Sequence, residues 1–225
     1  MPSLAQRAMA EFLGTAFLLA AVVGSGIMAQ RLAGGNVALA LLCNTLATGA
    51  ILPVIILMFG SVSGAHFNPA VSAAFALRGE LRWSIAALYV AAQIIAAIAG
   101  AWVAHLMFDL PVWQISTTVR SGGGQWLAEG VATFGLLLTI FGCLARVPAA
   151  IPYAVGLYIT SAYWFTASTS FANPAVTIAR SLSDTFAGIA PAGAPAFMAA
   201  QFAGMLVAVA IAPILWPAKV RKGRP

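Results

Sequence analysis

The chain has 225 residues, of which 62% are hydrophobic and only 7% are charged, and its mean hydropathy is +0.96. A soluble domain carries about 25% charged residues, so this composition excludes an ordinary soluble protein and indicates a membrane protein. The formal net charge is +6, and much of it lies in the C-terminal segment AKVRKGRP. Anionic lipid headgroups are a sufficient partner for such a charge, and we expect no nucleic-acid partner.

Six apolar runs are about 20 residues long, which is enough to cross a hydrocarbon core of about 30 Å as a helix. They cover residues 9–29, 37–60, 83–106, 125–145, 149–166 and 194–216, and the fifth is the shortest. Glu11 interrupts the first run early, so we expect this run to remain as a span and not to be a cleaved signal peptide. The sequence therefore predicts an all-α membrane protein with six transmembrane helices.

The basic residues are distributed unequally between the loops. An even number of spans puts both termini on one side of the membrane, and cytoplasmic loops carry an excess of Lys and Arg. With the N-terminus inside, the outer side holds Arg31, Arg120 and Arg180, and the cytoplasmic side holds Arg7, Arg78, Arg82, Arg146, Lys219, Arg221, Lys222 and Arg224. We therefore expect both termini in the cytoplasm, with residues 219–225 forming a basic cytoplasmic tail.

Three short motifs occur twice along the chain, in the same order. MAEFLGTAFLL matches LAEGVATFGLL, Asn-Pro-Ala occurs in both halves, and YVAAQIIA matches FMAAQFAG. The paired residues are Glu11 and Glu129, Asn68 and Asn173, and Gln93 and Gln201. The pattern predicts one channel domain over 1–225, made of a repeat at 1–108 and a second at 120–218. Because each repeat has three spans, the second copy must be inverted in the membrane.

Each Asn-Pro-Ala lies between two spans, in segments 60–80 and 167–190 that are too short to cross alone and look re-entrant. Proline is favoured at the first helical position and Asn is a favoured N-cap. Each tripeptide, Asn68-Pro69-Ala70 and Asn173-Pro174-Ala175, therefore predicts the start of a half-helix. Two inverted half-helices would direct their positive ends and their Asn donors at one central spot, which favours neutral hydroxyl-bearing solutes or water and repels cations.

These features resemble the major intrinsic protein family, the aquaporins and aquaglyceroporins, and SGAHFNPAV is close to that family's first signature. The resemblance implies that Asn68 and Asn173 are the central pore donors. It also implies that Glu11 and Glu129 hold the re-entrant loops by accepting backbone N–H bonds, which agrees with the need of an intramembrane carboxylate for partners. A homotetramer in a bacterial cytoplasmic (inner) membrane is further implied.

The family's outer constriction uses four positions. Three of them carry over to Thr48, Ser170 and Val176, and the fourth is either Tyr163, which we rank first, or Ser161. Most members have arginine where this chain has Val176. The resemblance therefore implies a wider and electrically milder ring, as in the arsenic-associated branch of the family, that passes glycerol-like polyols or neutral metalloid hydroxides such as arsenous acid.

Arg180 lies four residues after Val176, so it shares a helix face one turn further out. One interpretation is a displaced positive charge at the outer mouth of the pore. The other, which we favour, is that Arg180 caps the half-helix or reaches water and headgroups at the membrane edge.

Three other functions fit parts of the pattern. A water-selective channel shares every motif, and an ion-coupled secondary transporter shares inverted repeats, although it needs an ionisable group in its path and only Glu11 and Glu129 qualify. A membrane enzyme is disfavoured because no His/Cys/Asp/Glu cluster and no nucleophile with a base partner is evident. We expect no catalytic residues, no cofactor and no metal.

Overall fold

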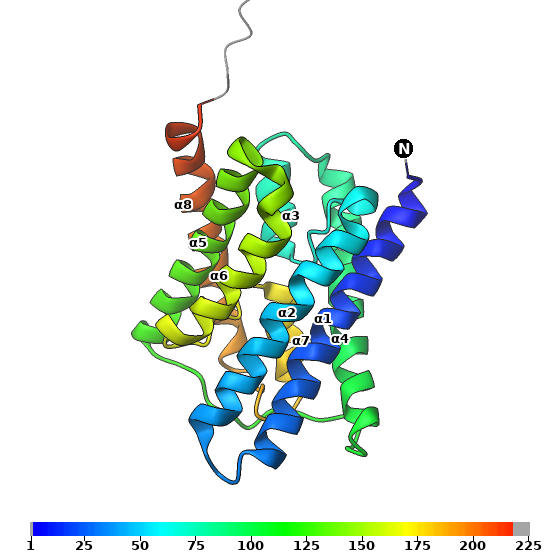
Figure 1. Cartoon of the computed structure of the whole chain (residues 1–225), viewed down its shortest axis with the longest axis vertical. Helices are drawn as coiled ribbons and strands as arrows, with labels where there is room; N and C mark the ends of the chain where they lie inside the picture. Colours follow the sequence, from blue (N-terminus) through cyan, green and yellow to red (C-terminus); the bar gives the residue numbers. More distant parts are fainter. Residues whose placement is uncertain (1, 218–225) are drawn as a thin grey trace, which may run out of the picture.

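The computed structural model describes residues 2–217, and this part of the chain is helical, with no strand. Figure 1 shows the helices as one upright bundle. They are α1 (Leu4–Leu32), α2 (Val37–Ser63), α3 (Pro69–Leu77), α4 (Trp83–Met107), α5 (Gly123–Arg146), the 3-10 turn η1 (Pro148–Ala150), α6 (Ile151–Phe165), α7 (Pro174–Ser181) and α8 (Ala194–Leu215). The all-α prediction is confirmed.

Within residues 2–217, five helices are long and apolar enough to cross a membrane, namely α1, α2, α4, α5 and α8. The helix α6 has 15 residues, which is about 22 Å at about 1.5 Å per residue. The preceding η1 turn has 3 residues, and it adds about 6 Å at about 2 Å per residue. Together η1 and α6 approach the thickness of the hydrocarbon core, so all six predicted spans are present and the fifth is the shortest, as expected.

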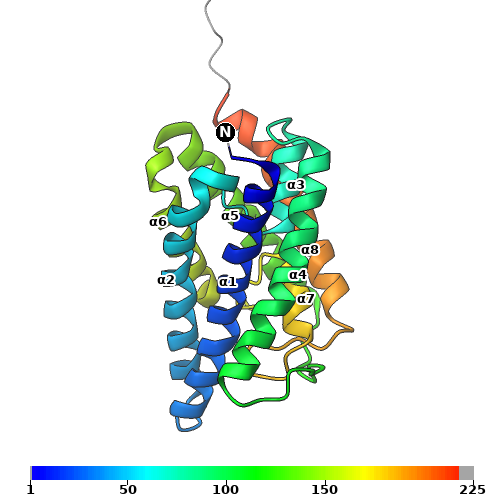
Figure 2. The same ribbon diagram turned by 90° about the vertical axis from the view of Figure 1, so that its right-hand side faces the viewer.

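The two short helices lie inside the bundle. α3 has 9 residues and α7 has 8, so neither can cross the membrane alone. In Figures 1 and 2, α3 lies in the half of the bundle nearer the N-terminus and α7 lies in the other half. These are the two predicted half-helices of an inverted repeat.

The two ends of the described chain lie at the same end of the bundle, which we call the inner end (Figure 1). The connection over residues 108–122 crosses the opposite, outer end. There the connection pairs with the segment that follows α7, because Ser116 N donates to Ser181 O at 3.0 Å and Ala190 N donates to Thr118 O at 2.7 Å. The predicted tail 219–225, with Lys219, Arg221, Lys222 and Arg224, lies outside the described residues.

The long helices approach one another closely at small residues. A Cβ added to Gly100 of α4 would overlap the carbonyl of Ala16 in α1, and one added to Gly204 of α8 would overlap the carbonyl of Gly130 in α5. Close backbone contact replaces the hydrophobic effect as the source of helix association in lipid. The pairs α1–α4 and α5–α8 are equivalent in the two repeats, so the same close helix packing at a glycine occurs in both.

Candidate functional site

The two half-helices begin with the same cap. Asn68 Oδ1 accepts a hydrogen bond from Ala70 N at 2.9 Å, and Asn173 Oδ1 accepts from Ala175 N at 3.0 Å. A proline follows each Asn as the first helical residue, where its missing N–H leaves no unpaired donor. Because the side-chain oxygen of each Asn is used by its own helix, the amide NH₂ group of each points away from the cap.

These amide groups link the half-helices across the centre of the bundle. Asn68 Nδ2 donates to the carbonyl of Ala172 at 2.7 Å, and Asn173 Nδ2 donates to the carbonyl of Phe67 at 2.8 Å. An Asn NH₂ has two hydrogens, so each Asn keeps one further donor for a solute. Both asparagines line one cavity.

The reciprocal bonds depend on an unusual backbone. Phe67 and Ala172, which precede the two asparagines, have φ angles of 50° and 49°. A left-handed conformation at a non-glycine residue costs on the order of 1–3 kcal/mol and persists only where its surroundings enforce it. It turns each carbonyl toward the Asn of the other half-helix.

Glu11 of α1 enforces the first of these turns. Its carboxylate is fully buried and accepts from His66 N at 2.9 Å and from Phe67 N at 2.7 Å. Ser63 Oγ at 2.6 Å and Gln93 Nε2 at 2.8 Å complete the set of donors. Four hydrogen bonds offset the removal of this charge from water, each contributing about 1.5–3 kcal/mol.

Glu129 of α5 does the same in the second half. It is fully buried and accepts from Phe171 N at 2.8 Å, Ala172 N at 2.9 Å and Gln201 Nε2 at 2.6 Å. Gln201 also donates to Thr177 of α7 at 2.9 Å. The same residues that repeat in the sequence therefore repeat as contacts, with a buried carboxylate and a buried glutamine behind each half-helix.

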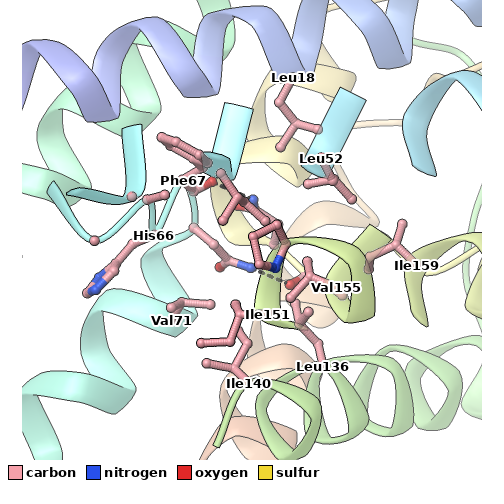
Figure 3. Close-up of a pocket in the computed structure, with 18 of the residues that line it drawn as sticks. Leu18, Leu52, His66, Phe67, Val71, Leu136, Ile140, Ile151, Val155 and Ile159 are labelled. Carbon is pink, nitrogen blue, oxygen red and sulfur yellow. Dashed lines mark hydrogen bonds between the residues drawn. The ribbon is translucent and has the colours of Figure 1, made fainter. Parts of the chain in front are cut away.

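A cavity of about 460 Å³ lies inside the bundle. From Leu144 and Pro148 near the inner end it passes the two asparagines and ends among Thr48, Tyr163 and Val176. Figure 3 shows its walls, which are largely aliphatic, with Leu18 and Leu52 facing Val71, Leu136 and Ile140. No Asp, Glu, Lys or Arg of the described chain lines it. The cavity can therefore offer a solute hydrogen bonds but no formal charge from these residues.

Three of the predicted ring residues meet at the outer end of this cavity. Thr48, Tyr163 and Val176 line it, and Tyr163 Oη donates to Thr48 Oγ1 at 3.3 Å. Ser161 is exposed on another face of α6, where its hydroxyl donates to Tyr158 O at 2.9 Å. Of the two alternatives on the fifth span, Tyr163 is therefore the one beside the cavity.

Ser170 is the fourth predicted ring residue, and its place in the ring stays a prediction. This residue is buried, does not line the cavity, and its hydroxyl has no hydrogen-bond partner among the described residues. Phe171, the next residue, lines the cavity instead. Sequence reasoning missed Phe171, although it corresponds to His66 in the first repeat, which also lines the cavity and bonds Ser72 Oγ through Nδ1 at 3.1 Å.

Part of our favoured interpretation of Arg180 is wrong: it lies in the last turn of α7, but it does not reach the membrane edge. The side chain is only 2% exposed, so it reaches neither water nor headgroups. Its Nε donates to the carbonyl of Ala187, and its guanidinium carbon lies 3.4 Å from the centre of the Phe171 ring. The reason is tertiary: the segment after α7 folds back over Arg180, and Ile189 N donates to Arg180 O at 3.2 Å.

The carboxylate anchors make a testable contribution to stability. Glu129→Gln replaces one acceptor oxygen by an NH₂ group that faces N–H donors, so we expect the free energy of unfolding to fall by roughly 3 kcal/mol. Thermal unfolding of the purified protein in detergent measures the change. Glu80→Gln is the matched control, because Glu80 is exposed and forms a surface ion pair with Arg78 that contributes about 1 kcal/mol or less. Equal melting temperatures for the two variants would contradict the anchoring role.

Comparison with known proteins agrees with this geometry. The family model described as major intrinsic protein matches residues 1–149. The chain is 57% identical over 208 residues to the protein named Aquaglyceroporin AqpS of Rhizobium meliloti, covering 92% of this chain and 89% of that protein. It is 30% identical to the probable glycerol uptake facilitator protein of Thermotoga maritima, covering 60% of this chain and 62% of that protein.

A solved structure shares the fold. The aquaglyceroporin from Plasmodium falciparum superimposes with a TM-score of 0.73 at 22% sequence identity, covering 96% of this chain and 98% of that one. The matched family model, the similarity to a relative over nearly the whole chain and the paired half-helices agree with one another. The chain belongs to the major intrinsic protein family, whose members are channels and not enzymes.

Proposed function

We propose that this passive channel passes glycerol-like polyols and neutral metalloid hydroxides such as arsenous acid, together with water. The observation that carries the proposal is the charge-free cavity wall, in which the Asn68 and Asn173 amides are the central donors. An ion entering such a cavity loses hydration without compensation, whereas a neutral hydroxyl compound exchanges its water bonds for these donors. The relatives named as an aquaglyceroporin and a probable glycerol uptake facilitator support this solute class.

The width of the outer ring is the second part of the proposal. Val176 lines the cavity at the position where the family pattern has arginine. Valine removes both the charge and the long planar side chain of arginine, so it leaves more room and a less polar surface. We assign the ring to Thr48, Tyr163 and Val176, without the hydroxyl of Ser170.

A water-selective channel is the alternative, and one observation favours it. The hydrogen bond from Tyr163 Oη to Thr48 at 3.3 Å draws two ring residues together and occupies the phenolic donor. A solute of glycerol size then has to displace or share this bond. By contrast, ion-coupled transport is disfavoured because Glu11 and Glu129 are occupied by their loops and do not line the cavity.

We further propose a bacterial cytoplasmic membrane with both termini inside, and a homotetramer. The basic residues Arg7, Arg78, Arg82 and Arg146 belong to the inner end of the bundle, and Arg31 and Arg120 belong to the outer end. This asymmetry supports the cytoplasmic placement of the inner end. Within this arrangement the repeats 1–108 and 120–218 form one channel domain.

The selectivity of the outer ring can be tested by substitution at Val176. Stopped-flow light scattering on proteoliposomes will show that the native protein passes glycerol and arsenous acid, and that Val176→Arg lowers both fluxes by at least about tenfold while water flux changes by less than about threefold. Val176→Met is the control, because it adds length without charge or donors. If native protein passes water alone, or if Val176→Arg leaves all fluxes unchanged, the selectivity proposal fails.

Substitutions at Tyr163 and Ser161 decide which α6 residue belongs to the ring. Tyr163→Phe removes only the hydroxyl that bonds Thr48, so we expect the glycerol-to-water flux ratio to change by about fivefold, the equivalent of about one hydrogen bond. Ser161→Ala removes a hydroxyl from the exposed face of the same helix and should leave the ratio unchanged. The reverse outcome, with an effect at Ser161 and none at Tyr163, would remove Tyr163 from the ring.

A further inference from the structure

The outer ring of Thr48, Tyr163 and Val176 lacks the arginine that would repel cations at the outer end of the pore. Two positive charges lie behind the cavity wall, beside a residue that lines it. Two arginines from different parts of the chain, Arg120 and Arg180, contact the same aromatic residue, Phe171. Phe171 is 4% exposed and lines the cavity.

Arg180 reaches Phe171 from α7. Its guanidinium carbon lies 3.4 Å from the ring centre, and its Nε donates to the carbonyl of Ala187. Its Nη1 is buried without a hydrogen-bond partner among the described residues. In the first repeat the corresponding contact is made by His66 and Phe75, whose ring centres are 4.7 Å apart. The second repeat therefore has a cation where the first has a neutral ring.

Arg120 reaches Phe171 from the outer connection. Its guanidinium carbon lies 5.3 Å from the ring centre, and its Nε donates to Gly188 O at 2.8 Å. The connection itself is held down, since Thr117 N and Thr117 Oγ1 both donate to Asp184 Oδ1, at 2.8 and 2.9 Å. Half-burial lowers the pKa of the Arg120 guanidinium, but an arginine starts so high that it stays charged at neutral pH.

Neither charge is neutralised by an ion pair. Within residues 2–217 the ion pair present is Arg78 with Glu80, at the inner end. Asp184 is exposed and engaged by Thr117, and the Glu129 carboxylate is occupied by Phe171 N, Ala172 N and Gln201. Arg120 and Arg180 both lie beside the Phe171 side chain, which lines the cavity, and neither has an ion-pair partner among the described residues. Together they produce a positive potential at the outer end of the cavity.

We propose that Arg120 and Arg180 form a cationic collar behind Phe171, and that this collar excludes cations at the outer mouth in place of an arginine in the ring. The collar repels charge without narrowing the pore, because its side chains stand behind the wall and do not line the cavity. Arg120 is thus a specificity-determining residue supplied by the α4–α5 connection. The proposal rests on the proposed passage of neutral solutes.

The test uses two probes of the same size and shape, urea and the guanidinium cation, whose radiolabelled uptake into proteoliposomes is measured at zero membrane potential. For Arg120→Gln we expect the guanidinium-to-urea flux ratio to rise at least about fivefold over native, because one unit charge beside the pathway is removed. Arg120→Lys keeps the positive charge but loses the planar guanidinium group. Its guanidinium-to-urea flux ratio should lie within about twofold of the native ratio.

Arg31→Gln is the matched control. Like Arg120, Arg31 lies at the outer end and donates to a backbone carbonyl, Phe108 O at 2.8 Å. Its guanidinium carbon lies 5.2 Å from the centre of the Phe108 ring. Phe108, unlike Phe171, does not line the cavity. Arg31→Gln should leave the guanidinium-to-urea flux ratio unchanged. If Gln and Lys at position 120 behave alike, or if Arg120→Gln raises both fluxes equally, Arg120 only supports the loop and the collar is refuted. Native protein that passes neither urea nor glycerol would instead refute the proposed function.

Discussion

Everything in this pore depends on two carboxylates that are buried in the membrane. Glu11 and Glu129 each accept the N–H groups of the residues just before an Asn-Pro-Ala tripeptide. These bonds stabilise Phe67 and Ala172 in the left-handed conformation, which is costly for any residue but glycine. The turned carbonyls then accept the amide bonds of the opposite asparagines, so the half-helix ends, the Asn donors and the cavity wall are positioned together.

The same arrangement separates charge from permeation. The carboxylates, the glutamines behind them and the two outer arginines all stand one layer away from the cavity, whose wall is neutral. A neutral solute therefore meets hydrogen-bond donors in a largely aliphatic channel. A cation meets a positive potential from the half-helix N-termini at the centre, and in our proposal from the Arg120–Arg180 collar at the outer end.

Much of this could be predicted from the sequence, because the determining residues are local and occur twice. Apolar length predicted six spans, the Asn-Pro pairs predicted two capped half-helices, and the family resemblance implied that Glu11 and Glu129 hold the re-entrant loops. Contacts that depend on long connections could not be predicted. Arg180 was expected at the membrane edge because helical spacing says nothing of a segment that folds back over it, and Arg120 had no local signal at all.

The central claim is that the outer ring is wide and neutral, and the size limit of the native channel tests it most directly. Permeability of native proteoliposomes should be measured for water, urea, glycerol and a four-carbon polyol, relative to protein-free liposomes. A wide neutral ring predicts that urea and glycerol permeate well above the lipid background and that permeability falls only for the larger polyol. A channel that passes water and excludes urea and glycerol would contradict the claim.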